Sequence, residues 1–154
     1  VRWVRAEGIH LTLRFLGDTE EEQIAALKLG LDEAVAGFAP FELCLGDMGC
    51  FPNVRRPRVI WAGVADAGER LAPLQKAVER MVRAQGWERE QGKAFRSHLT
   101  LGRVRQGQRP PQGEWLRQPP ALAFEVGEVE LIQSRLKPTG AEYSTLHRAL
   151  LGAV

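Results

Sequence analysis

The tetrad His-Leu-Thr-Leu occurs twice in this chain, at residues 10–13 and again at 98–101. The chain has only three histidines and five threonines. Agreement of this kind by chance is expected on the order of once in several hundred such chains, even before the leucines are counted. We therefore interpret the tetrads as copies within a duplicated chain, and we expect each half to contribute one equivalent strand.

Both tetrads lie in segments that alternate between polar and apolar residues, which is typical of a half-buried strand. The histidine and the threonine then project from one face, while the two leucines point into the core and set the register. If the halves are related by a pseudo-two-fold axis, two imidazoles and two hydroxyls converge. The candidate catalytic residues are His10, Thr12, His98 and Thr100.

Such a convergence suits acid–base chemistry at an anion. An unperturbed imidazole has a pKa of about 6.5, so at neutral pH one histidine can donate a proton while the other accepts one. The threonine hydroxyls could hold nonbridging oxygens where negative charge grows. A centre that needs proton removal on one side and proton donation on the other is a phosphodiester.

Metal binding is the main rival interpretation of the tetrads. A catalytic zinc usually has three protein ligands, and neither tetrad has a further His, Cys, Asp or Glu on the same strand face. We therefore expect no metal and no cofactor. His147 lacks a threonine two residues later and is interpreted as structural. Cys44 and Cys50 are expected to be buried thiols, because nothing beside them in sequence activates a nucleophile.

The length of 154 residues predicts a single domain, residues 1–154, and a hydrophobic content of 44% predicts a globular one. No apolar run approaches the roughly 20 residues that span a bilayer. The N-terminus shows no signal-peptide pattern. With only two cysteines and no CxxC, neither a disulfide scaffold nor a zinc site is favoured. We expect a cytoplasmic protein, without membrane contact, that acts as a monomer.

Periodicity and turn residues predict strands and helices that alternate without a strict βαβ rhythm, so the expected class is α+β with two similar halves. A capping box of Thr19 with Glu22 is expected to begin the first helix. The expected strands are 9–16, 40–45, 58–64, 95–103, 121–135 and 143–150, and the expected helices are 19–37 and 71–86.

Positive charge concentrates locally, although the formal net charge is only +2. Between Lys93 and Arg117 six basic residues stand against one acid, Glu114, and a second basic group is Arg55, Arg56 and Arg58. Solvated faces are the plain alternative. Arginine-rich loops beside a reactive site also suit a phosphate-bearing substrate, because the guanidinium fork matches phosphate oxygens.

Four stretches, in order along nearly the whole chain, resemble a known family. They are His-Leu-Thr-Leu-Arg-Phe-Leu-Gly at 10–17, Arg-Val-Ile-Trp at 58–61, His-Leu-Thr-Leu-Gly-Arg at 98–103 and Ser-Arg-Leu-Lys-Pro-Thr-Gly-Ala-Glu-Tyr at 134–143. The sequence is similar to the two-histidine phosphoesterase superfamily, most closely to the LigT-like RNA 2′,3′-cyclic phosphodiesterases.

This resemblance implies a bilobal, duplicated α+β fold, with two antiparallel sheets around a central cleft and helices outside. It implies hydrolysis, without metal, of a 2′,3′-cyclic phosphate on RNA or a small nucleotide, leaving a 2′-phosphate. His10 would donate the proton to the leaving 3′ oxygen and His98 would activate water. Thr12 and Thr100 would hold the phosphate, and Arg103 would approach the substrate. The resemblance also implies a further strand and helix before Val1.

Two alternatives remain open. The same site run in reverse would make a 2′–5′ RNA ligase. From another class, the chain could be a non-catalytic RNA-binding module that uses segment 93–117, with the tetrads as relics. That segment lacks the interleaved aromatic residues of a base-stacking platform, which disfavours the binding module.

Overall fold

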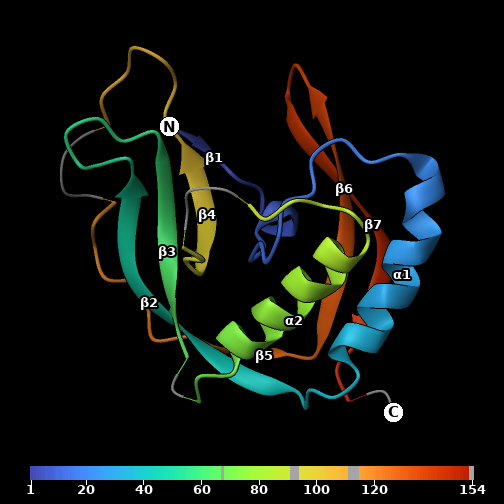
Figure 1. Ribbon diagram of the computed structural model, residues 1–154. Coiled ribbons are helices and arrows are strands. Elements are labelled where there is room, and N and C mark those ends of the chain that lie inside the picture. Colours follow the sequence, from blue (N-terminus) through green and yellow to red (C-terminus); the bar gives the residue numbers. More distant parts are fainter. Residues whose placement is uncertain (67, 91–93, 111–114, 153–154) are drawn as a thin grey trace. The chain divides into compact units, whose positions relative to one another are not determined.

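The computed structural model describes residues 1–66, 68–90, 94–110 and 115–152 (Figure 1). Helices and antiparallel strands occur together, which confirms the expected α+β class. The elements are β1 (Arg2–Trp3), the 3₁₀ helix η1 (Ala6–Gly8), α1 (Glu21–Val35), β2 (Phe41–Phe51), β3 (Val59–Ala65), α2 (Leu71–Ala84), β4 (His98–Arg103), β5 (Ala123–Val126), β6 (Glu128–Lys137) and β7 (Gly140–Leu150).

The chain divides into two compact units, which are described separately. The first unit consists of Val1–Thr12, Leu43–Ala67 and Arg96–Phe124. The second unit consists of Leu13–Glu42, Gly68–Phe95 and Glu125–Val154.

A five-stranded sheet of order β1-β4-β3-β2-β5 forms the body of the first unit. Its central strand β3 is rich in β-branched and aromatic residues, which favour the pleated conformation. Ile60 and Ala62 point to the buried face, with side chains 0% and 2% exposed. Ile60 packs with Val104 and Trp115 in a small apolar core. Val59, Trp61 and Gly63 alternate with the two buried residues of β3 and lie on its opposite face.

Strand β2 continues to Phe51, six residues beyond the expected end at Leu45. The glycines of this segment read as turn signals in the sequence, but they lie inside the strand. A Cβ placed on Gly49 would come within 2.3 Å of the Trp61 ring on the neighbouring strand. Gly49 is thus a site of close approach between side chain and backbone, the other common use of a strand glycine.

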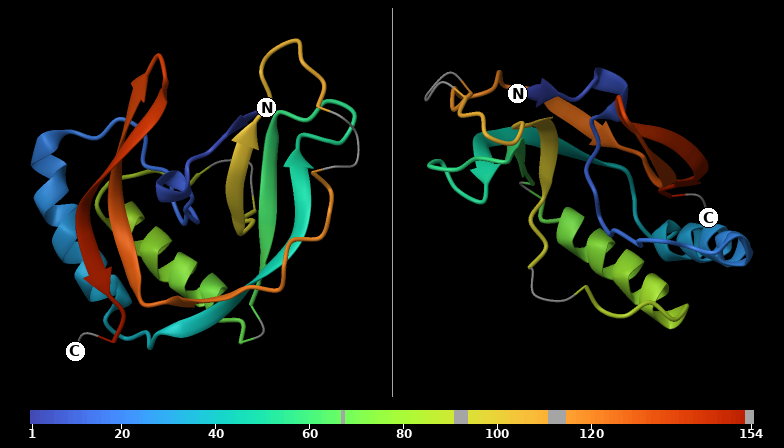
Figure 2. Two further views of the ribbon diagram at one scale, coloured as in Figure 1. Left: turned by 180° about the vertical axis from the view of Figure 1, so that it is seen from behind. Right: turned by 90° about the horizontal axis from the view of Figure 1, so that it is seen from above.

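The second unit contains α1, α2 and the antiparallel hairpin of β6 and β7 (Figure 2). The helical periodicity predicted from sequence is confirmed, because its apolar positions are buried and α1 packs against α2 and β7. No helix in the described part of the chain is long and apolar enough to cross a membrane. The buried helix residues include Leu27, Leu31, Val35, Leu71, Leu74 and Val78.

The N-terminus of α1 differs by one residue from the expectation. Glu20, not Thr19, is the N-cap, and its capping box is formed with Gln23. The hydroxyl of Thr19 instead donates a hydrogen bond to the carbonyl of Gly17 at 3.1 Å. Thr19 with Glu22 and Glu20 with Gln23 are overlapping pairs with capping-box spacing, and α1 uses the second pair and begins at Glu21.

Two expected strands are broken in the structure. Residues 9–16 form only an isolated bridge at Leu11. The carbonyls of Leu13 and Leu16 accept hydrogen bonds from the side chains of Gln75 and Trp87, so side chains rather than a neighbouring strand satisfy them. The expected strand 121–135 is split between β5 and β6 at Gly127.

Candidate active site

Residues 10–12 of the first tetrad lie beside the second tetrad, residues 98–101, in the first unit. Leu11 forms an antiparallel bridge with Leu99 of β4. Flanking residues in such a pairing project from the face opposite to the bridged leucines. His10, Leu11 and Thr12 therefore belong to the same compact unit as the second tetrad. The juxtaposed pairs are His10 with Thr100 and Thr12 with His98.

Both imidazoles are held by the same hydrogen bond. Nδ1 of His10 lies 2.8 Å from the carbonyl oxygen of Gly8, and Nδ1 of His98 lies 2.7 Å from that of Arg96. A carbonyl only accepts, so Nδ1 carries the proton in each neutral ring. In both rings Nε2 is then the nitrogen that gains or loses a proton.

Two aromatic residues surround His98. The ring centroid of Phe51 lies 5.2 Å from that of His98, with the planes at 89°, and Trp61 lies 6.3 Å away. Phe51 and Trp61 also contact each other, at 5.2 Å. An edge-to-face arrangement of this kind restricts ring rotation. His98 is therefore oriented from one side by aromatic packing and at Nδ1 by the backbone.

Arg103 lies on the same sheet face as the polar residues of the second tetrad. Thr100 pairs with Trp61 and Arg103 with Val59, and these two partners stand two residues apart on β3. The register shifts between Ile60 and Trp61, so β4 has one extra residue. An uninterrupted strand would turn Arg103 to the opposite face. The bulge brings it back to the face of Thr100.

Arg2 is a candidate that the sequence analysis missed. It pairs directly with Arg103 across β1 and β4, and both are exposed. Like charges directly opposite each other on a sheet are destabilising. Among the described residues neither arginine has an ion-pair partner. Two unneutralised guanidinium groups thus stand on the same face as the tetrads, a place that suits an anion. A two-residue strand leaves no periodic signal in the sequence.

The basic residues singled out in the sequence gather in the first unit. The unit has ten arginines against four aspartates and glutamates, although the whole chain carries only +2. Lys93, Glu114 and 111–113 of the basic stretch lie outside the described residues. The arginines of the basic groups that are described are exposed, namely Arg55, Arg56, Arg58, Arg96, Arg103, Arg105, Arg109 and Arg117. The unit that contains the tetrads is thus suited to an anionic ligand.

His147 lies in the second unit, where its Nε2 is 2.8 Å from a carboxylate oxygen of Asp32. This contact agrees with the structural role expected for it. Among the described residues, no three His, Cys, Asp or Glu side chains are grouped so that they could hold a metal.

The expectation of two buried thiols is wrong for Cys44, which is exposed on the outward face of β2 next to buried Leu43. Cys50 is partly buried, and burial raises the pKa of its thiol. Strict alternation would place Cys44 and Cys50, six residues apart, on one face of β2. The register shift between Leu45 and Met48 adds one residue to β2, so the two cysteines lie on opposite faces.

Comparison with known proteins agrees with this arrangement. The family model of the 2′-5′ RNA ligase superfamily matches residues 2–138. A curated RNA 2′,3′-cyclic phosphodiesterase of Aquifex aeolicus is 34% identical, covering 98% of this chain and 82% of the relative. One of Archaeoglobus fulgidus is 37% identical, covering 95% and 81%. The crystal structure of E. coli LigT complexed with 3′-AMP is similar, with a TM-score of 0.74 and 29% identity over 97% of this chain and 80% of LigT. The chain therefore belongs to the 2′-5′ RNA ligase superfamily.

Proposed function

We propose that this protein hydrolyses the 2′,3′-cyclic phosphate at the end of an RNA, or of a small nucleotide, to a 2′-phosphate. The observation that carries the proposal is the pairing of the tetrads through Leu11 and Leu99, with each imidazole held at Nδ1 by the carbonyl two residues earlier. The relatives named RNA 2′,3′-cyclic phosphodiesterase support the same reaction.

In the proposed reaction, Nε2 of His98 takes a proton from water as the water oxygen bonds to phosphorus. The bond from phosphorus to the 3′ oxygen breaks, and Nε2 of His10 donates a proton to that oxygen. Opening the ring thus consumes one water and leaves a 2′-phosphate. Positioned acid and base groups typically contribute about 10²–10⁴-fold each.

Two hydroxyl groups and two guanidinium groups are proposed to stabilise the negative charge on the phosphate. The hydroxyls of Thr12 and Thr100 would donate to the nonbridging oxygens, where charge develops. Arg103 and Arg2 would hold the same phosphate or its neighbour, which would relieve the repulsion between them. This donor set is proposed to work without a metal or other cofactor.

The test is incubation of the protein, with EDTA present, with a short RNA that ends in a 2′,3′-cyclic phosphate. A 2′-phosphate product is expected. A 3′-phosphate would show that His10 and His98 exchange roles. No reaction by the folded protein, with RNA binding that survives loss of both histidines and falls steeply with salt, would instead favour a non-catalytic RNA-binding module.

The name of the superfamily favours a second candidate, ligation. The same site run in reverse would join a 2′,3′-cyclic end to a 5′ hydroxyl and form a 2′–5′ linkage. Relative rates of hydrolysis and joining, measured on one cleaved RNA, distinguish the two.

We further infer that residues 1–154 form a single two-histidine phosphoesterase domain of two pseudo-symmetric lobes, acting as a monomer in the cytoplasm. The repeated tetrads, each with the same Nδ1 hydrogen bond, support an internal duplication. The two free cysteines agree with a reducing compartment.

A further inference from the structure

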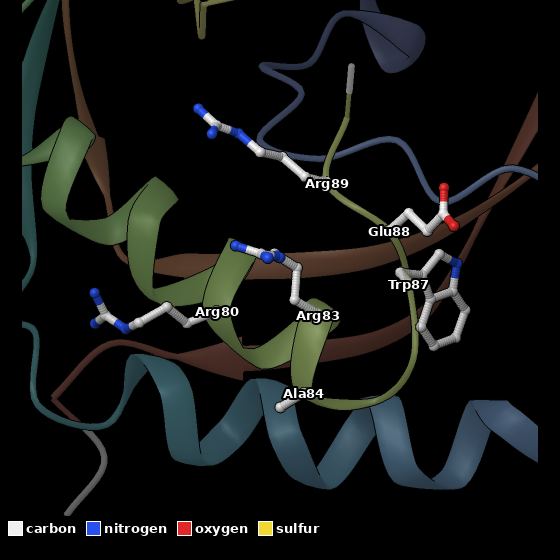
Figure 3. A pocket seen from close by; sticks show the side chains of 6 residues that line it. All are labelled: Arg80, Arg83, Ala84, Trp87, Glu88 and Arg89. Atoms are coloured by element: carbon white, nitrogen blue, oxygen red, sulfur yellow. The ribbon is translucent and has the colours of Figure 1, made fainter.

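Three arginines that belong to neither tetrad line a pocket in the second unit. Arg80 and Arg83 belong to α2, and Arg89 follows the end of that helix (Figure 3). We call these three residues the arginine cluster. Ala84, Trp87 and Glu88 complete the lining.

The spacing of the arginine cluster gathers its charges. Arg80 and Arg83 are three residues apart, so they share one helix face. In Figure 3 the guanidinium groups of all three arginines extend to the same side, whereas the carboxylate of Glu88 extends to the other. All three arginines are exposed. A ligand in solution can therefore reach them.

The arginine cluster is not neutralised by the protein. Other basic side chains of the second unit form ion pairs, including Arg14 with Glu79 at 3.1 Å and Arg148 with Glu130 at 3.0 Å. Among the described residues, no carboxylate lies within 4.0 Å of a cluster guanidinium. The second unit contains more acidic than basic residues, yet none of its described carboxylates pairs with the arginine cluster. Three unpaired guanidinium groups at one pocket indicate a site for an external anion.

Residues 14–16 hold the segment that carries Arg89 in place. The indole Nε1 of Trp87 donates to the carbonyl of Leu16 at 3.1 Å. The guanidinium of Arg14, only 5% exposed, donates to the carbonyl of Glu88 and pairs with Glu79 of α2. These contacts fix the backbone beside Arg89 relative to α2. A ligand therefore does not have to order this segment when it binds, which lowers the entropic cost of binding.

We propose that the arginine cluster binds successive backbone phosphates of single-stranded RNA. The inference rests on the proposed function, because the bound RNA would be the polynucleotide part of a substrate whose end carries the cyclic phosphate. Guanidinium groups on a helix turn and on the segment after it offer several separate forks, which suits several phosphates. Among the described residues, no exposed large hydrophobic side chain occurs between 71 and 90, so the insertion that a membrane surface needs is disfavoured.

The experiment measures binding of a fluorescent oligouridylate of about ten nucleotides with a 3′ hydroxyl end, which offers the catalytic residues no cyclic phosphate. The variant is R80Q/R83Q/R89Q. The matched control, K28Q/R70Q/R135Q, removes the same charge from elsewhere in the second unit. We expect the dissociation constant of the cluster variant to rise about tenfold or more relative to the control. The salt slope of log K should lessen by about 2, because each single-strand phosphate contact contributes about 0.7.

Hydrolysis of a cyclic mononucleotide serves as the reference for folding and catalysis, and the cluster variant should retain it. Equal RNA affinity of the cluster variant and the control would overturn the inference while leaving the proposed function intact. Loss of binding to anionic phospholipid vesicles, with RNA binding retained, would also overturn it. If the wild-type protein hydrolyses no cyclic phosphate, the proposed function fails, and the binding comparison still decides whether the cluster takes RNA.

Discussion

Arg2 lies directly opposite Arg103, at adjacent positions of β1 and β4, on the sheet face that also carries Thr100. Such a pair of like charges lowers stability unless an anion lies between them. Their position on this face is consistent with binding of the substrate phosphate.

Arg2→Gln should therefore impair activity without impairing the fold. We expect kcat/KM for a cyclic-phosphate RNA to fall about tenfold, as one charge-assisted contact is worth about 1.5–3 kcal/mol. The melting temperature should stay level or rise, because the repulsion is removed. Arg5→Gln, which removes an exposed arginine of the same segment, is the control. A fall in melting temperature with unchanged kinetics would contradict the assignment.

His10→Ala and His98→Ala should each lower kcat by about 10²–10⁴-fold. The wild-type rate should follow a bell-shaped pH profile, because one histidine must be protonated and the other deprotonated. The residual rate of His10→Ala should lose the decline at high pH, and that of His98→Ala the decline at low pH. Steady-state rates across the pH range check this, and full activity in either variant would refute the paired mechanism.

Replacing the hydroxyls of the tetrads tests the oxyanion contacts. Thr100→Val removes the hydroxyl but keeps the shape, and we expect kcat to fall by about 10²–10³-fold. Thr100→Ser retains a donor and should restore most of the rate. Thr12→Val and Thr12→Ser form the equivalent pair. If valine and serine variants have the same rate, the threonines contribute packing rather than hydrogen bonds.

Gly49→Ala should destabilise the first unit through Trp61. The added methyl group would lie 2.3 Å from two carbons of the indole ring, so the ring must move. We expect a loss of about 1–3 kcal/mol in the free energy of unfolding. Because Trp61 lies beside His98, kcat should fall as well. Gly37→Ala is the control, since no heavy atom lies within 4 Å of its added Cβ. Equal denaturant midpoints for the two variants would speak against the close approach.

Cys50 should make stability depend on pH in the alkaline range. Burial raises the pKa of its thiol above the ordinary 9.0, so the unfolded chain loses this proton at lower pH than the folded chain. The contribution is fully present below the unfolded pKa and is lost as pH rises through the folded value. Cys50→Ala should reduce the decline of stability between about pH 8 and 10. Denaturant unfolding across this pH range measures the decline, with Cys44→Ala, which replaces an exposed thiol, as the control. An undiminished decline in Cys50→Ala would contradict the prediction.

Patterns between near neighbours in sequence predicted much of this structure. The apolar spacing of Leu27, Leu31 and Val35 predicted α1, because residues three and four apart share a helix face. Alternation within each tetrad predicted that its histidine and threonine would project to one side, because this pattern depends only on neighbouring residues. The predicted start of α1 and end of β2 were less accurate. Two overlapping capping-box pairs lie at the start of α1, and the glycines before Phe51 read as turn signals although Gly49 lies against the Trp61 ring inside the strand.

The sequence by itself determined the chemistry of the candidate site: two imidazoles and two hydroxyls in two identical tetrads. Only the tertiary structure decided what surrounds them. The bulge that turns Arg103 to the face of Thr100, and the pairing that sets Arg2 beside it, depend on register between strands far apart in sequence. Local clusters in the sequence already hold eight of the ten arginines of the first unit, and strand pairing adds Arg2 beside Arg103. Long-range strand pairing decides which of these charges share one sheet face, because the register between strands is not specified by residues that are near neighbours in sequence.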